Sequence, residues 1–107
     1  MRMWNVSTDY LCNQHLLGEH LEMHMFAGSI RLGKNIAGFI AKGFVETDKI
    51  KSRHDDLAVE LKKRGFKHKS PMEAFDIVAN GKVDVQANLV SLSTRCVMCR
   101  MRIDFKR

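Results

Sequence analysis

The chain has 107 residues, of which 45% are hydrophobic, so we expect a single compact domain over residues 1–107 with a modest core. Eighteen Lys and Arg residues against twelve Asp and Glu residues give a net charge of +6, a balance typical of small domains that bind nucleic acid. No apolar run approaches the ~20 residues of a membrane-spanning helix, and the N-terminus has no signal-peptide core.

Residues 1–6 are predicted to form an arm that leads into a first helix. Ser7, Thr8 or Asp9 can cap this helix, which is expected to run to about Gly28. Helical periodicity predicts an apolar stripe on one of its faces, made of Tyr10, Leu17, Leu21 and Met25. A roughly opposite face carries the polar and reactive side chains Cys12, His15, Glu19 and Glu22.

Two further helices are predicted in the middle of the chain. The first covers Lys34–Lys42 and ends at Gly43, and the second covers about Asp48–Arg64 and ends at Gly65. The second helix should turn its regularly spaced apolar residues to the core, namely Ile50, Leu57, Ala58 and Leu61.

The last third of the chain contains another helix start, because Ser70, Pro71 and Glu73 combine a cap, a first-turn proline and a capping glutamate. That helix should end near Gly81. Residues 83–90 alternate weakly, which indicates an extended segment, and a final helix is predicted over 91–103. One face of it carries Leu92, Cys96, Cys99 and Ile103. We therefore predict an all-α fold of about four to five helices, with the arm packed near the first helix.

Three histidines in the predicted first helix, His15, His20 and His24, are candidate metal ligands. A zincin site needs the spacing H-E-x-x-H, whereas His20 and Glu22 lie two residues apart and about 200° apart around a helix. His20 and His24 share a face, but the sequence indicates no third ligand beside them. The sequence therefore favours structural histidines over a metallohydrolase site.

The three cysteines are an odd number without a secreted disulfide framework, so we expect reduced thiols and an intracellular protein. Cys96 and Cys99 form half of a zinc motif, which Cys12 and His15 could complete if the first and last helices touch. Apolar packing of the cysteines is the favoured interpretation. The sequence alone therefore predicts no metal, and zinc remains the alternative.

The remaining candidates lie on the face with His15, Glu19 and Glu22. Such a run of acids is commonly only a solvated face. In a basic protein, however, two glutamates one helical turn apart beside a histidine are equally consistent with a functional site.

The string V-S-x-x-x-L-x-x-Q-H-L-x-x-E-x-x-E, from Val6 to Glu22, resembles the first helix of the phage-type pyrimidine-dimer DNA glycosylases. Two later blocks are also similar to that family, Arg53–Phe66 and His68–Pro71. The resemblance implies a compact all-α enzyme that needs no cofactor. It also implies a substrate, double-stranded DNA with pyrimidine dimers or abasic sites. We expect the protein to act as a monomer, although the sequence does not show its oligomeric state.

In that family the nucleophile is the α-amine of the first residue, and one glutamate of the first helix is essential. The resemblance assigns these catalytic roles to Met1 and Glu22, and DNA-binding roles to Arg2, Gln14 and His15. The residue after Met1 is large, so we expect Met1 to be retained. The family arginines that flank the glutamate are replaced here by Leu21 and Met25, with His20 and His24 as candidate substitutes.

The chemistry requires groups of these types. An α-amine has an ordinary pKa of about 7.7–8.0, well below that of lysine, so a useful fraction is neutral near pH 7. A neutral amine can attack C1′ of a nucleotide and form a Schiff base, while a carboxylate stabilises developing positive charge and moves protons. The alternative function from another class is a non-catalytic basic domain that binds nucleic acid, with or without a structural zinc.

Overall fold

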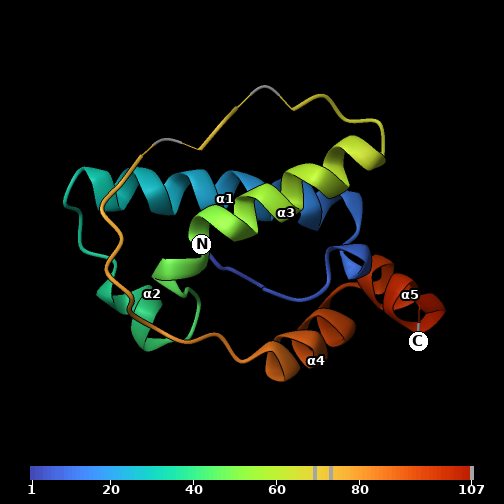
Figure 1. Cartoon of the computed structure of the whole chain (residues 1–107). Coiled ribbons are helices and arrows are strands. Elements are labelled where there is room, and N and C mark those ends of the chain that lie inside the picture. Colours follow the sequence, from blue (N-terminus) through green and yellow to red (C-terminus); the bar gives the residue numbers. More distant parts are fainter. Residues whose placement is uncertain (69, 73, 107) are drawn as a thin grey trace.

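A computed structural model describes residues 1–68, 70–72 and 74–106 of the chain (Figure 1). Within these ranges the protein has five α-helices, two short 3-10 turns and no β-strand, which confirms the predicted all-α class. The Cα radius of gyration is 13.6 Å, close to the roughly 13 Å of a compact domain of this size. No helix of the described residues has the length and apolar character that crossing a membrane requires.

The centre of the fold is a pair of long helices, α1 (Asn13–Arg31) and α3 (Ile50–Lys63), which pack side by side (Figure 1). The 3-10 turn η1 (Thr8–Tyr10) precedes α1. The short helix α2 (Ala37–Ala41) and the 3-10 turn η2 (Thr47–Lys49) connect the pair. The prediction for α3 is confirmed, since its four predicted core residues are buried and Gly65 ends it with a left-handed φ of 91°. Helix α2 is confirmed but begins at residue 37 rather than 34.

The predicted orientation of α1 was wrong. Leu17, Leu21 and Met25, the predicted apolar stripe, are 43%, 60% and 47% exposed. The buried residues of α1 are instead those of the adjacent face, namely Leu16, Glu19, Met23, Phe26 and Ala27. Helical spacing alone could not select this face, because it includes an ionisable residue whose partners come from distant parts of the chain.

The ends of α1 also differ from the prediction. The helix is capped by Cys12, whose Sγ accepts a hydrogen bond from the His15 backbone N–H, and it ends at Arg31 rather than Gly28. Of the predicted caps, Ser7 directly precedes η1, and Thr8 and Asp9 lie within it. Tyr10 is the last residue of that turn. The chain thus makes a separate short turn before the long helix begins.

The predicted helix over 70–81 does not form in the described residues 70–72 and 74–81, and the predicted capping Glu73 lies outside the described residues. This segment is held by η2 instead, because Thr47 bonds through its backbone N–H and its hydroxyl to the Asn80 carbonyl at 3.0 and 3.2 Å. Gly81 has a φ of 81°, and a Cβ there would clash with the Val45 carbonyl oxygen, so the chain passes too closely for any side chain.

The C-terminal part contains two helices where one was predicted. Helix α4 (Val85–Arg95) is capped by the Asp84 side chain, so the predicted extended segment over 83–90 is helical from residue 85. Helix α5 (Val97–Lys106) follows after a break at Cys96, which has an extended backbone with φ −129° and ψ 110°. Leu92, Cys99 and Ile103 are buried as predicted, and Cys96 is half-buried.

The N-terminal arm, residues 1–6, runs through the middle of the molecule between the α1–α3 pair and α4 (Figure 1). Met3, Trp4 and Val6 are buried with 0%, 7% and 2% exposure, so the arm is part of the core. The predicted packing of the arm near the first helix is therefore confirmed.

Candidate active site

The arm brings the α-amine of Met1 to the side chain of Glu22 on α1. The amine nitrogen lies 3.8 Å from Glu22 Oε1, and the two side chains are only 15% and 29% exposed. An amine and a carboxylate from distant positions in the chain thus share one partly shielded place on the surface. The two residues that the resemblance named as catalytic are neighbours in space.

Burial, the charges of the N-terminus and Glu19, and the Arg2 backbone set the pKa of Glu22. Burial raises the pKa of the Glu22 carboxyl above its ordinary value, while the N-terminal charge and a hydrogen bond from the Arg2 backbone N–H act in the opposite direction. The carboxyl thus faces a cation and a backbone donor on the side of the arm and lies in a partly dry environment elsewhere. Such an arrangement suits a group that must exchange protons during a reaction.

The inner part of the arm is held by Glu19, one helical turn before Glu22. Glu19 Oε2 accepts hydrogen bonds from the Trp4 and Asn5 backbone N–H groups at 3.1 and 3.5 Å. The same carboxylate forms a buried bidentate pair with Arg53, at 2.6 Å from Nε and 2.8 Å from Nη2. Arg53 also donates to the Val6 carbonyl at 2.6 Å. Glu19, which the sequence could not separate from Glu22, therefore anchors the arm.

A second anchor comes from α4. The Asn88 side chain, which is buried, donates to the Trp4 carbonyl at 2.8 Å and accepts from Arg2 Nη2 at 2.5 Å. The Arg2 guanidinium lies over the rings of Trp4 and Phe44, 4.1 and 4.7 Å from their centroids. The observed contacts of Arg2 are therefore inside the protein, and its role in DNA binding stays a prediction. Sequence reasoning missed Asn88 and Arg53, since both act on the arm from distant helices.

The other two predicted DNA-binding residues lie on the first turn of α1. Gln14 is exposed. His15 is half-buried with its ring edge-on to Trp4, 5.9 Å between centroids, and its Nδ1 lies 3.3 Å from Cys12 Sγ. Burial lowers the pKa of His15, with Glu19 opposing, which favours the neutral imidazole.

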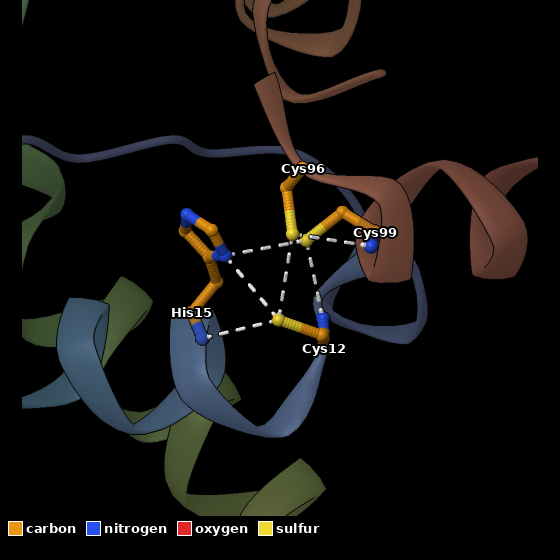
Figure 2. Close-up of side chains that lie close together, drawn as sticks. All are labelled: Cys12, His15, Cys96 and Cys99. Carbon is orange, nitrogen blue, oxygen red and sulfur yellow. Dashed lines mark hydrogen bonds between the residues drawn. The ribbon is translucent and has the colours of Figure 1, made fainter. Parts of the chain in front are cut away.

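Two groups of side chains have the composition of metal ligands. Cys12, His15, Cys96 and Cys99 converge where the first turn of α1 meets the start of α5 (Figure 2). The second group consists of His20, His24, His54 and His68, which bring together α1, α3 and the segment after α3. In each group the ligand atoms all lie within 4.8 Å of one another. The sequence offered Cys12 and His15 as partners for the C-terminal cysteines, but it gave no signal for His54 and His68.

The family model for pyrimidine dimer DNA glycosylase matches residues 1–74 of the chain. The chain belongs to this family. No curated protein and no solved structure matches it. The matched residues contain the arm, Glu19, Glu22 and Arg53, so the approach of Met1 to Glu22 lies within the part that the family shares.

Membership makes the protein a DNA glycosylase of the pyrimidine-dimer type, with DNA as its substrate. The match leaves out the C-terminal third, which carries α4, α5, Cys96 and Cys99. Asn88, the second anchor of the arm, also belongs to this C-terminal part.

Proposed function

We propose that the protein is a bifunctional enzyme that removes a damaged pyrimidine and then cuts the strand at the resulting abasic site. The nucleophile is the α-amine of Met1, and Glu22 is the carboxylate that stabilises positive charge and transfers protons. The single observation that carries the proposal is the 3.8 Å approach of the Met1 amine to Glu22 Oε1, at the partly exposed end of an arm whose Met3, Trp4 and Val6 are buried.

The reaction follows from these two groups. The neutral amine donates its electron pair to C1′ as the bond from C1′ to the pyrimidine breaks, and the base leaves with the bonding electrons and gains a proton. The C1′–O4′ bond then breaks as O4′ takes a proton from solvent, which opens the sugar ring and gives the protonated Schiff base. Glu22 as an anion stabilises the cationic C1′ and then accepts a proton from C2′, which expels the 3′ phosphate by β-elimination. Water finally hydrolyses the imine and regenerates the amine.

DNA recognition in this proposal involves the surface around the arm. Gln14 and His15 lie on the first turn of α1 and are assigned to the sugar–phosphate backbone. Arg2 is assigned a positioning role through its contacts with Trp4 and Asn88, in addition to its charge near the DNA. Access to C1′ requires a distorted duplex, which a pyrimidine dimer or an abasic site makes less costly. The enzyme is proposed to act as a monomer.

The test is reductive trapping of the Schiff base. Borohydride added during reaction with an abasic-site duplex, and in parallel with an ultraviolet-irradiated duplex, should link the protein covalently to DNA. Peptide mass analysis should place the adduct on the Met1 nitrogen, since reduction converts the imine to a stable secondary amine.

The control is the same protein with its α-amine acetylated, compared with protein whose lysines alone are methylated. Acetylation should abolish trapping and lysine methylation should preserve it. Trapping through a lysine, or cutting by the acetylated protein, would overturn the assignment of the nucleophile. Salt-sensitive DNA binding without any cutting would favour the non-catalytic alternative.

A further inference from the structure

We propose that Cys12, His15, Cys96 and Cys99 bind one structural Zn²⁺ ion in a tetrahedral site that fastens α5 to the start of α1. The four side chains point toward a common centre in Figure 2, from two helices that are far apart in the sequence. The site takes no part in the reaction assigned to Met1 and Glu22, but it shares His15 with the proposed DNA surface: Nδ1 of His15 faces the sulfurs, and Nε2 is the atom left for the DNA backbone. It also departs from the expectation of an enzyme that contains no metal.

The distances match those of a zinc site. With Zn–S bonds of about 2.3 Å and a Zn–N bond of about 2.0–2.1 Å, a tetrahedron places its sulfur atoms roughly 3.8 Å apart and its nitrogen roughly 3.6 Å from each sulfur. The observed separations are 3.9 Å between Cys12 Sγ and Cys96 Sγ, and 3.3 and 3.5 Å from His15 Nδ1 to Cys12 Sγ and Cys99 Sγ. Three of the six separations are therefore close to those of zinc ligands, and all four atoms lie within 4.8 Å of one another.

The local structure of both halves of the site is the same. Cys12 precedes α1 and its sulfur accepts from the backbone N–H of His15, three residues later, at 3.5 Å. Cys96 precedes α5 and its sulfur accepts from the backbone N–H of Cys99, again three residues later, at 3.4 Å. In each half the first ligand caps a helix and the second lies in the first turn, so two helix N-termini face the same point. Because the break at Cys96 ends α4 and lets α5 begin, it places the N-terminus of α5 at this point.

These surroundings suit the charge that the site would carry. Three thiolates, one neutral imidazole and Zn²⁺ sum to one negative charge, which the positive ends of two helices stabilise. The Cys12 backbone N–H donates to Cys99 Sγ at 3.3 Å, so each of the three sulfurs accepts a backbone hydrogen bond. Hydrogen bonds of this kind orient thiolate ligands in metal sites. On binding, the three thiols give up their protons to solvent.

A disulfide or simple apolar packing of the cysteines fits the cluster less well than a metal does. A disulfide needs its sulfurs about 2.05 Å apart, whereas all three cysteines are free and Cys12 Sγ lies 3.9 Å from Cys96 Sγ. Apolar packing would place the sulfurs against carbon atoms. The three cysteines do pack within the core or against it, but their sulfurs also contact a second sulfur, a ring nitrogen or backbone N–H groups, which apolar packing alone does not explain.

The site would tie the part of the chain outside the family match to the part inside it. Cys12 and His15 lie within residues 1–74, and Cys96 and Cys99 lie beyond them. Helix α4, which packs with α5, carries the Asn88 anchor of the arm. We therefore expect loss of zinc to loosen α4 and α5 and, through them, the arm.

The experiment is metal analysis of the full-length protein purified under reducing conditions without chelator. The site predicts about one equivalent of zinc that is lost from Cys96→Ser/Cys99→Ser and retained by the matched control Met98→Ser, an exposed residue between the two ligands. Exchange with Co²⁺ should give the near-ultraviolet absorption of cobalt bound to thiolate in the wild type and the control only. Chelator should lower the melting temperature by more than about 10 °C.

The wild type alone decides the question if the double variant does not fold. Titration of the reduced wild type with Zn²⁺ against a coloured competing chelator should show uptake at a site that protects the thiols from alkylation. Absence of uptake, thiols alkylated equally with and without Zn²⁺, or a native disulfide by mass would each overturn the proposal.

The histidine group carries a second, independent inference. We propose that His20, His24, His54 and His68 bind one divalent transition ion through neutral imidazoles. Four of the five histidines in the chain converge here, with ring centroids 4.6–5.2 Å apart in the pairs that touch. Imidazole ligands suit Zn²⁺, Cu²⁺ and Ni²⁺, and Zn²⁺ is the ion to test first.

Burial and hydrogen bonding support this assignment. In the described part of the chain, the Nε2 atoms of His20 and His68 are shielded from solvent and have no hydrogen-bond partner. Polar atoms in that situation are costly unless something binds them. His54 Nδ1 lies 2.8 Å from Asp55 Oδ1, and a carboxylate at this place orients a metal-binding histidine. His54 Nε2 lies 3.1 Å from the Ser70 carbonyl oxygen, so binding an ion through Nε2 requires His54 to give up that contact.

A double variant of each site tests the two proposals separately. The wild type should then hold about two equivalents of metal, one lost in Cys96→Ser/Cys99→Ser and the other in His20→Ala/His68→Ala. The histidine variant should keep the thiolate–cobalt absorption. The cysteine variant should keep one equivalent of metal, and binding of that metal should shift the imidazole proton resonances. A wild type that holds no metal beyond the cysteine site, before and after titration with Zn²⁺, would overturn the histidine proposal alone.

Discussion

The two ends of the N-terminal arm are both held to α1 by glutamates, yet the two contacts differ in kind. At the inner end, Glu19 is buried with 1% exposure and is saturated by Arg53 and two backbone N–H groups. At the outer end, Glu22 is half-buried and faces the Met1 amine at 3.8 Å, too far for a hydrogen bond. The inner contact is closed, whereas the amine and the carboxylate of the outer contact lie close together without a hydrogen bond between them.

One helical turn thus separates a stabilising carboxylate from a reactive one. A carboxylate with all its lone pairs occupied and no solvent access can hold a backbone in place but has no capacity left for reaction. A carboxylate with a loose cationic neighbour retains that capacity. The rigid inner end also fixes the position of the outer one, because only two residues precede the buried Met3.

The largest effect is expected at the outer end. Glu22→Gln should reduce single-turnover cutting of an abasic-site duplex by roughly 10²–10⁴-fold, the usual contribution of a general acid–base group. Urea unfolding should be little changed, because this carboxyl has few buried contacts. The control is Asp48→Asn, an exposed residue of η2. Full turnover in Glu22→Gln would show that Glu22 is an ordinary surface residue without a catalytic role.

Substitution at the inner end of the arm should lower the stability of the fold. Glu19→Gln leaves Arg53 buried without its anion, and breaking such a pair should lower the free energy of unfolding by about 3–5 kcal/mol. Urea denaturation followed by circular dichroism measures this loss. A change below about 1 kcal/mol, typical of exposed pairs, would contradict the closed character of the inner contact.

The anchor from α4 should have an intermediate effect. Asn88→Ala removes the donor to the Trp4 carbonyl and the acceptor of Arg2, which should cost about 1–3 kcal/mol of stability. Trapping of the Schiff base should slow as well, since the arm loses its contact with α4. Gln86→Ala, which truncates an exposed amide side chain of the same helix, provides the matched control. Equal stability of the two variants would show that Arg53 and Glu19 hold the arm alone.

The smallest effect is expected for Gln14→Ala. The side chain is exposed, so stability should not change, and the loss of one neutral hydrogen bond to DNA should weaken binding roughly two- to tenfold. Fluorescence anisotropy at fixed salt measures the affinity. Unchanged affinity together with unchanged turnover would remove Gln14 from the DNA surface.

The sequence predicted well what depends on short spacing. The all-α class, the core face of α3 and the end of that helix at Gly65 follow from periodicity and from a single glycine, and all are confirmed. The pairing of Met1 with Glu22 came from a motif of fixed length. In each case the determining residues lie within a few turns of one another or of the chain start.

Three of the failures share a cause, because each depends on a partner that is remote in the chain. The buried face of α1 is selected by Arg53, and the segment before Gly81 is held by Thr47 instead of forming a helix. The break at Cys96 coincides with the approach of its sulfur to that of Cys12, 84 positions away. No local pattern contains these partners, so helix propensity alone gave the wrong result at each place.

The burial of the arm also limits the access of exopeptidases to the amino terminus. The Met3 backbone N–H donates to the Phe44 carbonyl at 2.6 Å, and the Met3 side chain is fully buried. Only Met1 and Arg2 precede this fixed residue, and Arg2 is itself held by Asn88, so an exopeptidase that needs several extended residues finds no such segment. Trimming of the first residue would require local unfolding of the arm, so the folded protein preserves its own amino terminus for as long as the arm stays seated.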